Sequence, residues 1–147
     1  MAQVRSSDAH WEGDLLGGNG SVTSGTSGAF GPLPVTWHAR TGASDTGLTS
    51  PEELLSAAWA SCFSMASSNE LAKAGFPVTS NDVSVSITAD KTDSGWTVLS
   101  AVLRLRAIVP NVDQATFRKA VEAAKDGCPI SRALKGNVGV TLDAELV

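Results

Sequence analysis

The chain has only two cysteines among its 147 residues, Cys62 and Cys128, and they do not form a Cys-x-x-Cys motif. Its two histidines, His10 and His38, lack the spacing to either cysteine that zinc ligands adopt, so we expect no metal site. In a reducing compartment a pair of cysteines is more often catalytic, metal-binding or incidental than a permanent crosslink. The two thiols are therefore the first candidates for reactive groups.

Long apolar runs and basic clusters are also missing. No run approaches the roughly 18 apolar residues of a membrane span, and the start of the chain has no apolar stretch of signal-peptide length. The 11 basic residues are scattered among 15 acidic ones, which gives a formal charge of −4 without the basic stripe that binds nucleic acid. We expect a cytoplasmic protein that binds neither membrane nor nucleic acid, with one domain over residues 1–147.

The first half of the sequence predicts strands followed by a long helix. Residues 1–40 alternate short mixed runs with turn residues, which is typical of a meander of short antiparallel strands, with Arg40 at the end of the last one. Residues 41–49 have the composition of a loop. The central helix is predicted over 50–74: Ser50 and Glu53 form a capping box, Pro51 suits the first turn, and Gly75 ends the helix.

The predicted central helix is apolar almost all the way round as far as Ser67, which indicates that it is covered on nearly all sides. A chain of this size cannot easily provide that cover alone. The apolar positions are Leu54, Leu55, Ala57, Ala58, Trp59, Ala60, Phe63, Met65 and Ala66.

The second half predicts a hairpin, two helices and a strand. Two alternating segments over 81–110 indicate a hairpin of longer strands, and Asp113 or Asn111 is expected to cap a helix that ends at Gly127. The helical region 113–135 includes a short helix after Cys128, and residues 137–146 form a closing strand. This order of elements predicts an α+β fold with mainly antiparallel sheets.

The reactive form of a cysteine is its thiolate, which the positive end of a helix or a nearby guanidinium stabilises. Cys128 precedes Pro129, a favoured first residue of a helix, so its sulfur is expected near the free N–H groups of the short helix. Cys62 lies within an apolar helix, where a cysteine is more often a small buried hydrophobic residue. Packing without chemistry is an alternative for both.

Three segments, in order along the chain, point to one family. They are Ser50-Pro-Glu-Glu-Leu-Leu-Ser-Ala-Ala-Trp-Ala-Ser-Cys-Phe-Ser-Met65, Cys128-Pro-Ile-Ser-Arg-Ala-Leu-Lys135, and Asn137-Val138 with Thr141-Leu-Asp143. Together they closely resemble the OsmC/Ohr family of peroxide-reducing thiol enzymes. The opening His10-Trp-Glu-Gly-Asp-Leu-Leu-Gly-Gly18 resembles the OsmC branch.

The resemblance implies an OsmC/Ohr-like α+β fold, with antiparallel sheets wrapped around a central buried helix in an intertwined homodimer. It implies a peroxidase of organic hydroperoxides, and of hydrogen peroxide, that acts in the oxidative or osmotic stress response as an antioxidant enzyme. The thiol cycle would need no cofactor, only an external dithiol reductant. By motif position, Cys62 would be the peroxidatic cysteine and Cys128 the resolving one, with Arg40 and Glu52 in the active site.

Helix geometry separates the two adjacent glutamates. At 100° per residue, Glu53 lies about 180° from Cys62 around the helix and Glu52 about 80°, so Glu53 fits the cap and Glu52 the site. Ten residues of straight helix place Glu52 about 15 Å from Cys62, too far for one guanidinium to contact both. Arg40 and Glu52 would then come from the partner subunit, or the helix would be broken between Glu52 and Cys62.

The large side chains near Cys62 are more often core than substrate contacts, yet Trp59, Phe63 and Met65 are candidates to line an apolar pocket for an organic peroxide. Two other functions stay open. One is a non-catalytic osmotic-stress or small-ligand-binding dimer with structural cysteines and unreactive thiols. The other is a thiol-dependent hydrolase, which is disfavoured because neither histidine is placed to act as its base.

Overall fold

The structure is a computed structural model that describes residues 1–42 and 47–147, so part of the loop predicted over 41–49 lies outside the described residues. Contacts divide the chain into two units, Met1–Leu54 and Leu55–Val147, and each is described by itself. The single domain over 1–147 stays a prediction. Within the described ranges, no helix has both the length and the apolar character needed to cross a bilayer.

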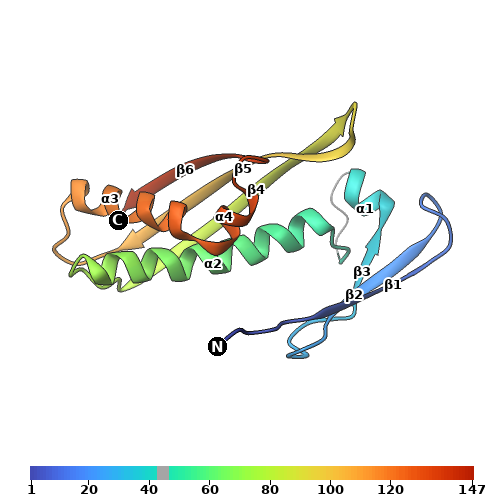
Figure 1. Ribbon diagram of the computed structural model, residues 1–147, viewed down its shortest axis with the longest axis horizontal. Coiled ribbons are helices and arrows are strands. Elements are labelled where there is room, and N and C mark those ends of the chain that lie inside the picture. The colour runs from blue at the N-terminus through green and yellow to red at the C-terminus, as the bar shows by residue number, and fades with distance from the viewer. Residues whose placement is uncertain (43–46) are drawn as a thin grey trace. The chain divides into compact units, whose positions relative to one another are not determined.

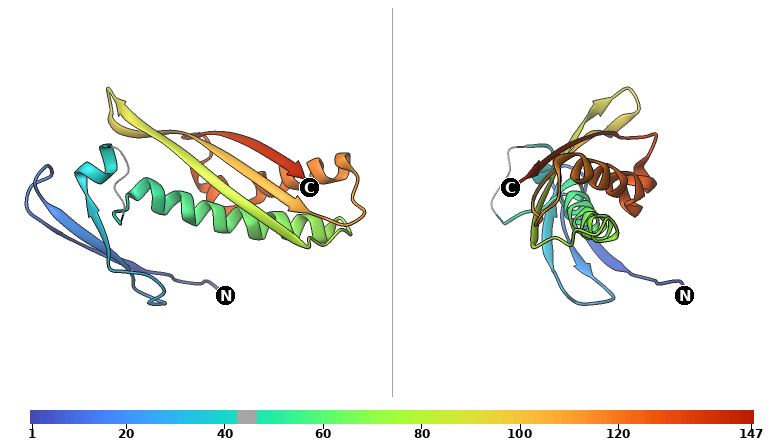
Figure 2. Two further views of the ribbon diagram at one scale, coloured as in Figure 1. Left: turned by 180° about the vertical axis from the view of Figure 1, so that it is seen from behind. Right: turned by 90° about the vertical axis from the view of Figure 1, so that its left-hand side faces the viewer.

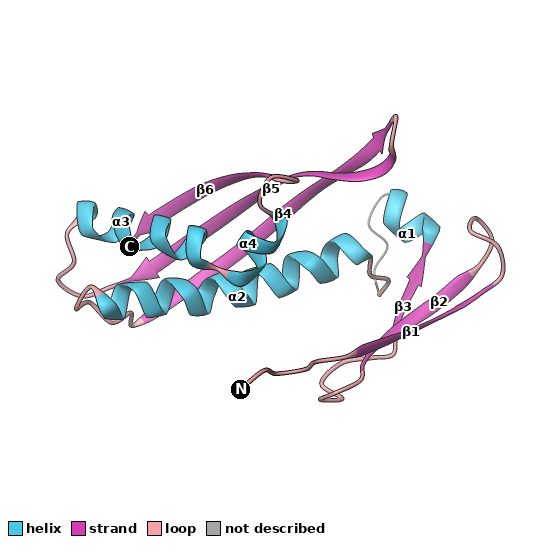
Figure 3. Ribbon diagram, viewed as in Figure 1, coloured by secondary structure: helices cyan, strands magenta, loops and turns pink. Residues whose placement is uncertain are grey.

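The first unit is built on a three-stranded antiparallel sheet, in the order β1 (Ser7–Glu12), β2 (Asn19–Ser24) and β3 (Leu33–Thr36) (Figure 3). A short helix, α1 (Trp37–Thr41), follows directly, where the sequence predicted a strand that ends in Arg40. The hydroxyl of Thr36 accepts the N–H of Ala39 at 3.0 Å and so starts a helical turn. Arg40 therefore lies on a helix.

The chain then returns to β3 before the central helix begins. The N–H of Thr49 donates to the carbonyl of Pro34 at 3.0 Å, next to an isolated parallel bridge between Val35 and Thr49. Helix α2 (Pro51–Lys73) starts two residues later, and the hydroxyl of Ser50 accepts the N–H of Glu53 at 3.2 Å. The first turn of α2 is thus fixed close to β3 and α1.

The second unit is a mixed sheet with helices on one face (Figures 1 and 2). Strands β4 (Ser80–Thr92) and β5 (Gly95–Ile108) form the long antiparallel hairpin. Helices α3 (Gln114–Gly127) and α4 (Pro129–Leu134) then carry the chain back, so β6 (Gly139–Leu146) pairs with β5 in parallel. A helical crossover is what a parallel pairing requires, and it makes the sheet mixed.

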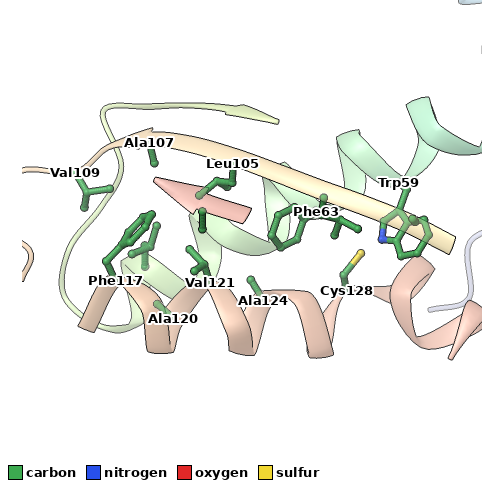
Figure 4. Close-up of a cluster of buried hydrophobic side chains, with 14 residues drawn as sticks. Trp59, Phe63, Leu105, Ala107, Val109, Phe117, Ala120, Val121, Ala124 and Cys128 are labelled. Atoms are coloured by element: carbon green, nitrogen blue, oxygen red, sulfur yellow. The ribbon is translucent and has the colours of Figure 1, made fainter. Parts of the chain in front are cut away.

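The core of this unit lies between the sheet and helices α2 and α3 (Figure 4). Strand β5 alternates between buried and exposed side chains, as its sequence pattern predicted, and the helices cover its buried face. The buried hydrophobic residues are Trp59, Phe63, Leu71, Ala101, Leu103, Leu105, Ala107, Val109, Phe117, Ala120, Val121, Ala124, Cys128 and Ala144.

Helix α2 buries one side against the described residues of the second unit. Its buried residues recur every four positions, at Trp59, Phe63, Ser67 and Leu71, and form one stripe against the core. The opposite face, which includes Ala58, Ser61, Met65 and Ala72, is exposed. Among the described residues of the second unit, none provides the predicted cover for this face.

Candidate active site

The two cysteines meet although 66 positions separate them in the sequence. Both thiols are free, and the Sγ of Cys128 lies 3.2 Å from the Sγ of Cys62, within hydrogen-bond distance for sulfur. Cys62 is half-buried on α2. Cys128 is fully buried in the junction between α3 and α4 (Figure 4). The fold thus produces a dithiol with one partly accessible member and one shielded member.

The junction that holds Cys128 is fixed by the backbone on both sides. Its N–H donates to the carbonyl of Ala124 at the end of α3, and its carbonyl accepts the N–H of Arg132 in α4, both at 2.9 Å. Pro129 is the first residue of α4, as expected. Cys128 is the N-cap residue of α4, next to the N–H groups near which its sulfur was expected, but its side chain makes no capping hydrogen bond to them. The Ile130 N–H of α4 bonds to Cys62 instead.

The surroundings of Cys62 favour its neutral form in the single chain. Burial raises the pKa of the Cys62 thiol above its ordinary value, and the Ile130 N–H opposes this because it stabilises the thiolate. The neighbouring Cys128 thiol raises the pKa further. This differs from the expected low-pKa cysteine, and it means that the described neighbours in the second unit do not supply the activating charge.

A cavity of about 510 Å³ opens beside Cys62, between α2 and the helices α3 and α4. Its wall is mostly apolar, and a polar end is formed by Asn69, Glu70 and Lys73. Lys73 is the one cation among the described residues lining it, and it is held by Glu70 at 2.7 Å, far along α2 from the thiol. The apolar residues of the wall are Met65, Ala66, Ala123, Ala124 and Pro129.

Of the three side chains considered for a substrate pocket, the structure places only Met65 on this cavity. Met65 is exposed, whereas Trp59 and Phe63 belong to the buried stripe of α2 and do not line the cavity. The assignment of Trp59 and Phe63 to a substrate pocket therefore stays a prediction, and in the single chain both side chains belong to the core. Residues three or four positions apart share a helix face, so both residues point with Ser67 and Leu71 into the core.

One contact near the thiols was not foreseen. The indole N–H of Trp59 donates to the hydroxyl of Ser131 at 2.9 Å, and both side chains are buried. Ser131 stands in the Cys-Pro-Ile-Ser segment that carried the family resemblance, but its sequence pattern gives no indication of a partner 72 positions away. Only the fold brings these residues together.

In the first unit, Arg40 and Glu52 form a two-point ion pair. The Nη2 and Nε atoms of Arg40 donate to Oε1 of Glu52 at 2.8 and 3.0 Å, and Nε also lies 3.3 Å from Oε2. The guanidinium carbon lies 5.7 Å from the ring centre of Trp37, within cation–π range. Arg40 keeps 30% of its side chain exposed, so the cation is oriented but still accessible.

The two glutamates at the start of α2 have different partners. Glu53 accepts the hydroxyl of Thr49 at 2.6 Å and gives its N–H to Ser50, which is a capping arrangement. Glu52 is the residue that orients Arg40. Helix α2 is continuous from Pro51 to Lys73, which excludes the alternative of a break between Glu52 and Cys62.

A second cavity, of about 350 Å³, lies beside Arg40 in the first unit. Its lining is almost entirely apolar, with the Arg40 side chain on its wall. The other lining residues are Trp11, Leu15, Val35, Thr36, Trp37 and Pro51. The first unit thus presents a positioned cation next to an apolar surface, and the second unit presents the dithiol next to a mostly apolar cavity.

Comparison with known proteins identifies the family. Residues 43–143 match the family model described as OsmC-like protein. The chain is 40% identical over 146 residues to "Peroxiredoxin OsmC" of Escherichia coli, which covers 99% of both chains. It is 36% identical over 99 residues to an organic hydroperoxide resistance protein of Xanthomonas axonopodis, covering 64% of this chain and 65% of the relative.

Solved structures agree at the level of the fold. The OhrB protein of Bacillus subtilis matches with a TM-score of 0.70 at 23% identity, covering 95% of this chain and 98% of that one. An organic hydroperoxide resistance protein of Elizabethkingia anophelis matches with a TM-score of 0.75 at 24% identity over the whole of both chains. The expected α+β, OsmC/Ohr-like fold is confirmed, and the chain belongs to the OsmC-like protein family.

Proposed function

We propose that this protein is a thiol-dependent peroxidase that reduces organic hydroperoxides, and hydrogen peroxide, through a Cys62 sulfenic acid and a Cys62–Cys128 disulfide. The observation that carries the proposal is the 3.2 Å contact between the two sulfurs, with Cys62 on the wall of a cavity and Cys128 buried behind it. The names of the OsmC and Ohr relatives support the same activity.

The reaction has two steps on the protein. The Cys62 thiolate attacks the distal peroxide oxygen, the O–O bond breaks, and the products are Cys62 sulfenic acid and, after protonation, an alcohol, or water from hydrogen peroxide. The Cys128 thiol then attacks the sulfenic sulfur, which forms the disulfide and releases water. A disulfide has sulfurs about 2.05 Å apart, so the two atoms need to approach by only about 1 Å. An external dithiol then reduces the disulfide by thiol–disulfide exchange.

Arg40 supplies the charge that Cys62 needs in this mechanism, and Glu52 holds its guanidinium. Because burial raises the pKa of Cys62, a cation beside the sulfur is required to populate the thiolate near neutral pH. Arg40 and Glu52 of one subunit complete the site at Cys62 of its partner in a homodimer. The continuous helix α2 supports this assignment, because it keeps Glu52 about 15 Å along the axis from Cys62 on the same chain.

The exposed face of α2 supports the homodimer. Ala58, Ser61 and Met65 are exposed on the longest helix of the described residues, directly beside Cys62, and a second copy of the chain would cover them. The free thiols are in keeping with the reducing cytoplasm, where we place the protein.

The lining of the cavity favours organic over inorganic peroxide. An alkyl or aryl group gains free energy when it leaves water for an apolar wall, and hydrogen peroxide has no such group. Met65 lies on this wall, three residues after Cys62 on α2, and its side chain is 67% exposed. It is the side chain we assign to substrate contact.

Mass spectrometry after one equivalent of an alkyl hydroperoxide tests the proposal. The wild-type protein should form a Cys62–Cys128 crosslink, and the Cys128→Ser variant should retain an oxygen adduct on Cys62. The raised pKa of Cys62 and the full burial of Cys128 are the observations that favour the alternative, a non-catalytic stress or ligand-binding dimer. If both thiols stay free after peroxide, the peroxidase is excluded and the alternative is favoured.

A further inference from the structure

The short helix α4 needs an external contact to hold its place. It has six residues, fewer than the dozen or more that make an isolated helix even marginally stable in water. Its first turn nevertheless has to be placed accurately, because it begins directly after Cys128 and contains the Ile130 N–H that bonds to Cys62. The contact that holds it should join α4 to α2, the helix that carries Cys62.

The hydrogen bond between Trp59 and Ser131 has the position that this role requires. Trp59 precedes Cys62 by three residues on α2, and Ser131 follows Cys128 by three residues on α4. Residues at this spacing share one helix face, so the Trp59–Ser131 bond and the Cys62–Cys128 contact lie about one turn apart between the same segments. The bond is 2.9 Å long and the sulfurs are 3.2 Å apart.

Because both partners are buried, the hydrogen bond favours one position of α4 relative to α2. Trp59 is fully buried and Ser131 is 8% exposed, so water cannot easily replace either partner if α4 shifts. An unpaired buried donor is costly, and the indole N–H has a single hydrogen to donate. The peptide N–H of Ile130 adjoins Ser131, so fixing the Ser131 side chain also fixes that donor.

From this geometry we infer that Trp59 and Ser131 are positioning residues, whose hydrogen bond holds the first turn of α4 so that Cys128 can close the disulfide on Cys62. The inference rests on the proposed peroxidase function. The step that it assists is the attack of the Cys128 thiol on the Cys62 sulfenic acid, which forms one S–S bond and releases water. Small misplacements of reacting atoms can lower such rates strongly, and loss of the bond is expected to slow closure about tenfold.

The test compares two variants that remove the bond from opposite sides, Ser131→Ala and Trp59→Phe, in the full-length protein. The readout is the rate of crosslink formation after one equivalent of an alkyl hydroperoxide, followed by rapid quenching and mass spectrometry. Both variants should form the Cys62–Cys128 disulfide about tenfold more slowly than wild type and accumulate the Cys62 sulfenic acid. The double variant should be no slower than the slower single one, because both changes remove the same interaction. Ser131→Thr keeps the hydroxyl and should restore closure.

Ser67→Ala is the matched control for loss of stability alone. Ser67 is a fully buried serine on the same stripe of α2, and its hydroxyl accepts the amide of Asn81 at 3.1 Å, away from the thiols. The Ser67→Ala variant should form the disulfide at the wild-type rate. Closure of Ser131→Ala and Trp59→Phe within twofold of wild type would overturn the inference, and so would an equal defect in Ser67→Ala.

Equilibration with glutathione separates this inference from the proposed function. The bond keeps the two thiols close, so its loss should lower the equilibrium constant for disulfide formation about tenfold, which is about 30 mV for a two-electron couple. A wild-type protein that is inert to peroxide would count against the peroxidase alone, and the glutathione equilibrium would still test the positioning role. An unchanged equilibrium in both variants would reject that role.

Discussion

At the scale of the residue, the ionisation of Cys62 depends on opposing neighbours. Burial and the Cys128 thiol raise the pKa of Cys62, and within the second unit the Ile130 N–H acts against them. A full positive charge stabilises a thiolate more than a neutral N–H does. The accessible guanidinium of Arg40, oriented by Glu52, is therefore the group on which we expect the reactivity of Cys62 to depend.

Replacing Arg40 should move the reaction to higher pH. Without the cation the pKa of Cys62 rises, so the thiolate fraction at neutral pH falls, and the peroxide rate should reach its plateau only at more alkaline pH than in wild type. We expect Arg40→Ala to lower kcat/KM at pH 7 by about 100-fold, within the range for loss of one charged transition-state contact. Stopped-flow measurement of sulfenic acid formation against pH checks this.

Arg40→Lys is the matched comparison. Lysine keeps the charge but lacks the planar two-point contact with Glu52, so its pH profile should lie between those of wild type and Arg40→Ala. Identical pH profiles in all three proteins would remove Arg40 from the mechanism.

At the scale of the element, the ends of helices α2 and α3 place the chemistry. Asp113 caps α3, and its carboxylate accepts the N–H groups of Ala115 and Thr116 at 3.0 and 2.9 Å and the Thr116 hydroxyl at 2.7 Å. The hydroxyl and N–H of Thr116 hold the pKa of Asp113 below its ordinary value. Since α3 ends next to Cys128, a secure start of this helix also supports the position of the thiol.

Asp113→Ala should lower the melting temperature at pH 7 by about 2–6 °C, because it removes an N-cap. A group whose folded-state pKa is depressed stabilises the fold above its unfolded pKa, here near 3.8, and this contribution is lost as the pH falls through the folded value. The difference between wild type and Asp113→Ala should therefore shrink below about pH 3.8. Calorimetry across pH measures it.

Asp113→Asn distinguishes the hydrogen bonds from the charge. It keeps an accepting oxygen and should stay close to wild type at pH 7, but without the acid-dependent loss. A difference for Asp113→Ala that persists unchanged in acid would contradict the assigned role.

Two glycines at helix ends should respond to alanine in opposite directions. Gly75, just after α2, has a φ of +91°, which a residue with a Cβ adopts only with strain, so Gly75→Ala should destabilise the fold by about 1 kcal/mol. Gly127 is the last residue of α3, has no positive φ, and an added Cβ would meet no atom within 4 Å. Gly127→Ala should therefore stabilise the fold by up to about 1 kcal/mol. Urea unfolding at one protein concentration compares the two, and effects of the same sign would refute the argument.

At the scale of the whole molecule, the proposed subunit sharing gives a clear prediction for mixed dimers. A dimer with Cys62→Ser on one chain and Arg40→Ala on the other retains one intact pair of Cys62 and Arg40 only if the pair spans the subunits. It should then show about half of the wild-type peroxidase activity per dimer. If each site is formed within one chain, both sites fail and the activity is lost.

The reciprocal dimer is the control. A wild-type chain paired with a Cys62→Ser/Arg40→Ala chain should be inactive when sites are shared and half-active when they are not. Tagged subunits purified in tandem, with the peroxidase assay as readout, therefore distinguish the two arrangements by opposite outcomes.

The sequence predicted most elements because their signals are local. The capping residues Ser50 and Asp113, the stop at Gly75 and the alternation of β5 each depend on neighbours a few positions away, and the structure has the corresponding helices and strands. The wrong assignment of 36–40 to a strand had a local cause as well. The hydroxyl of Thr36 can cap a turn, and this signal outweighed the strand-like composition.

By itself, then, the sequence determined where most of the helices and strands form, which two sulfurs were available, and which family the motifs resembled. Tertiary structure alone decided that Cys62 and Cys128 touch across 66 positions, that the Ile130 N–H bonds to Cys62 rather than Cys128, and that Trp59 reaches Ser131. It also turned Trp59 and Phe63 into the core and Met65 onto the cavity. These contacts depend on the packing of distant segments, and the burial that results raises the pKa of Cys62, an effect that no local pattern encodes.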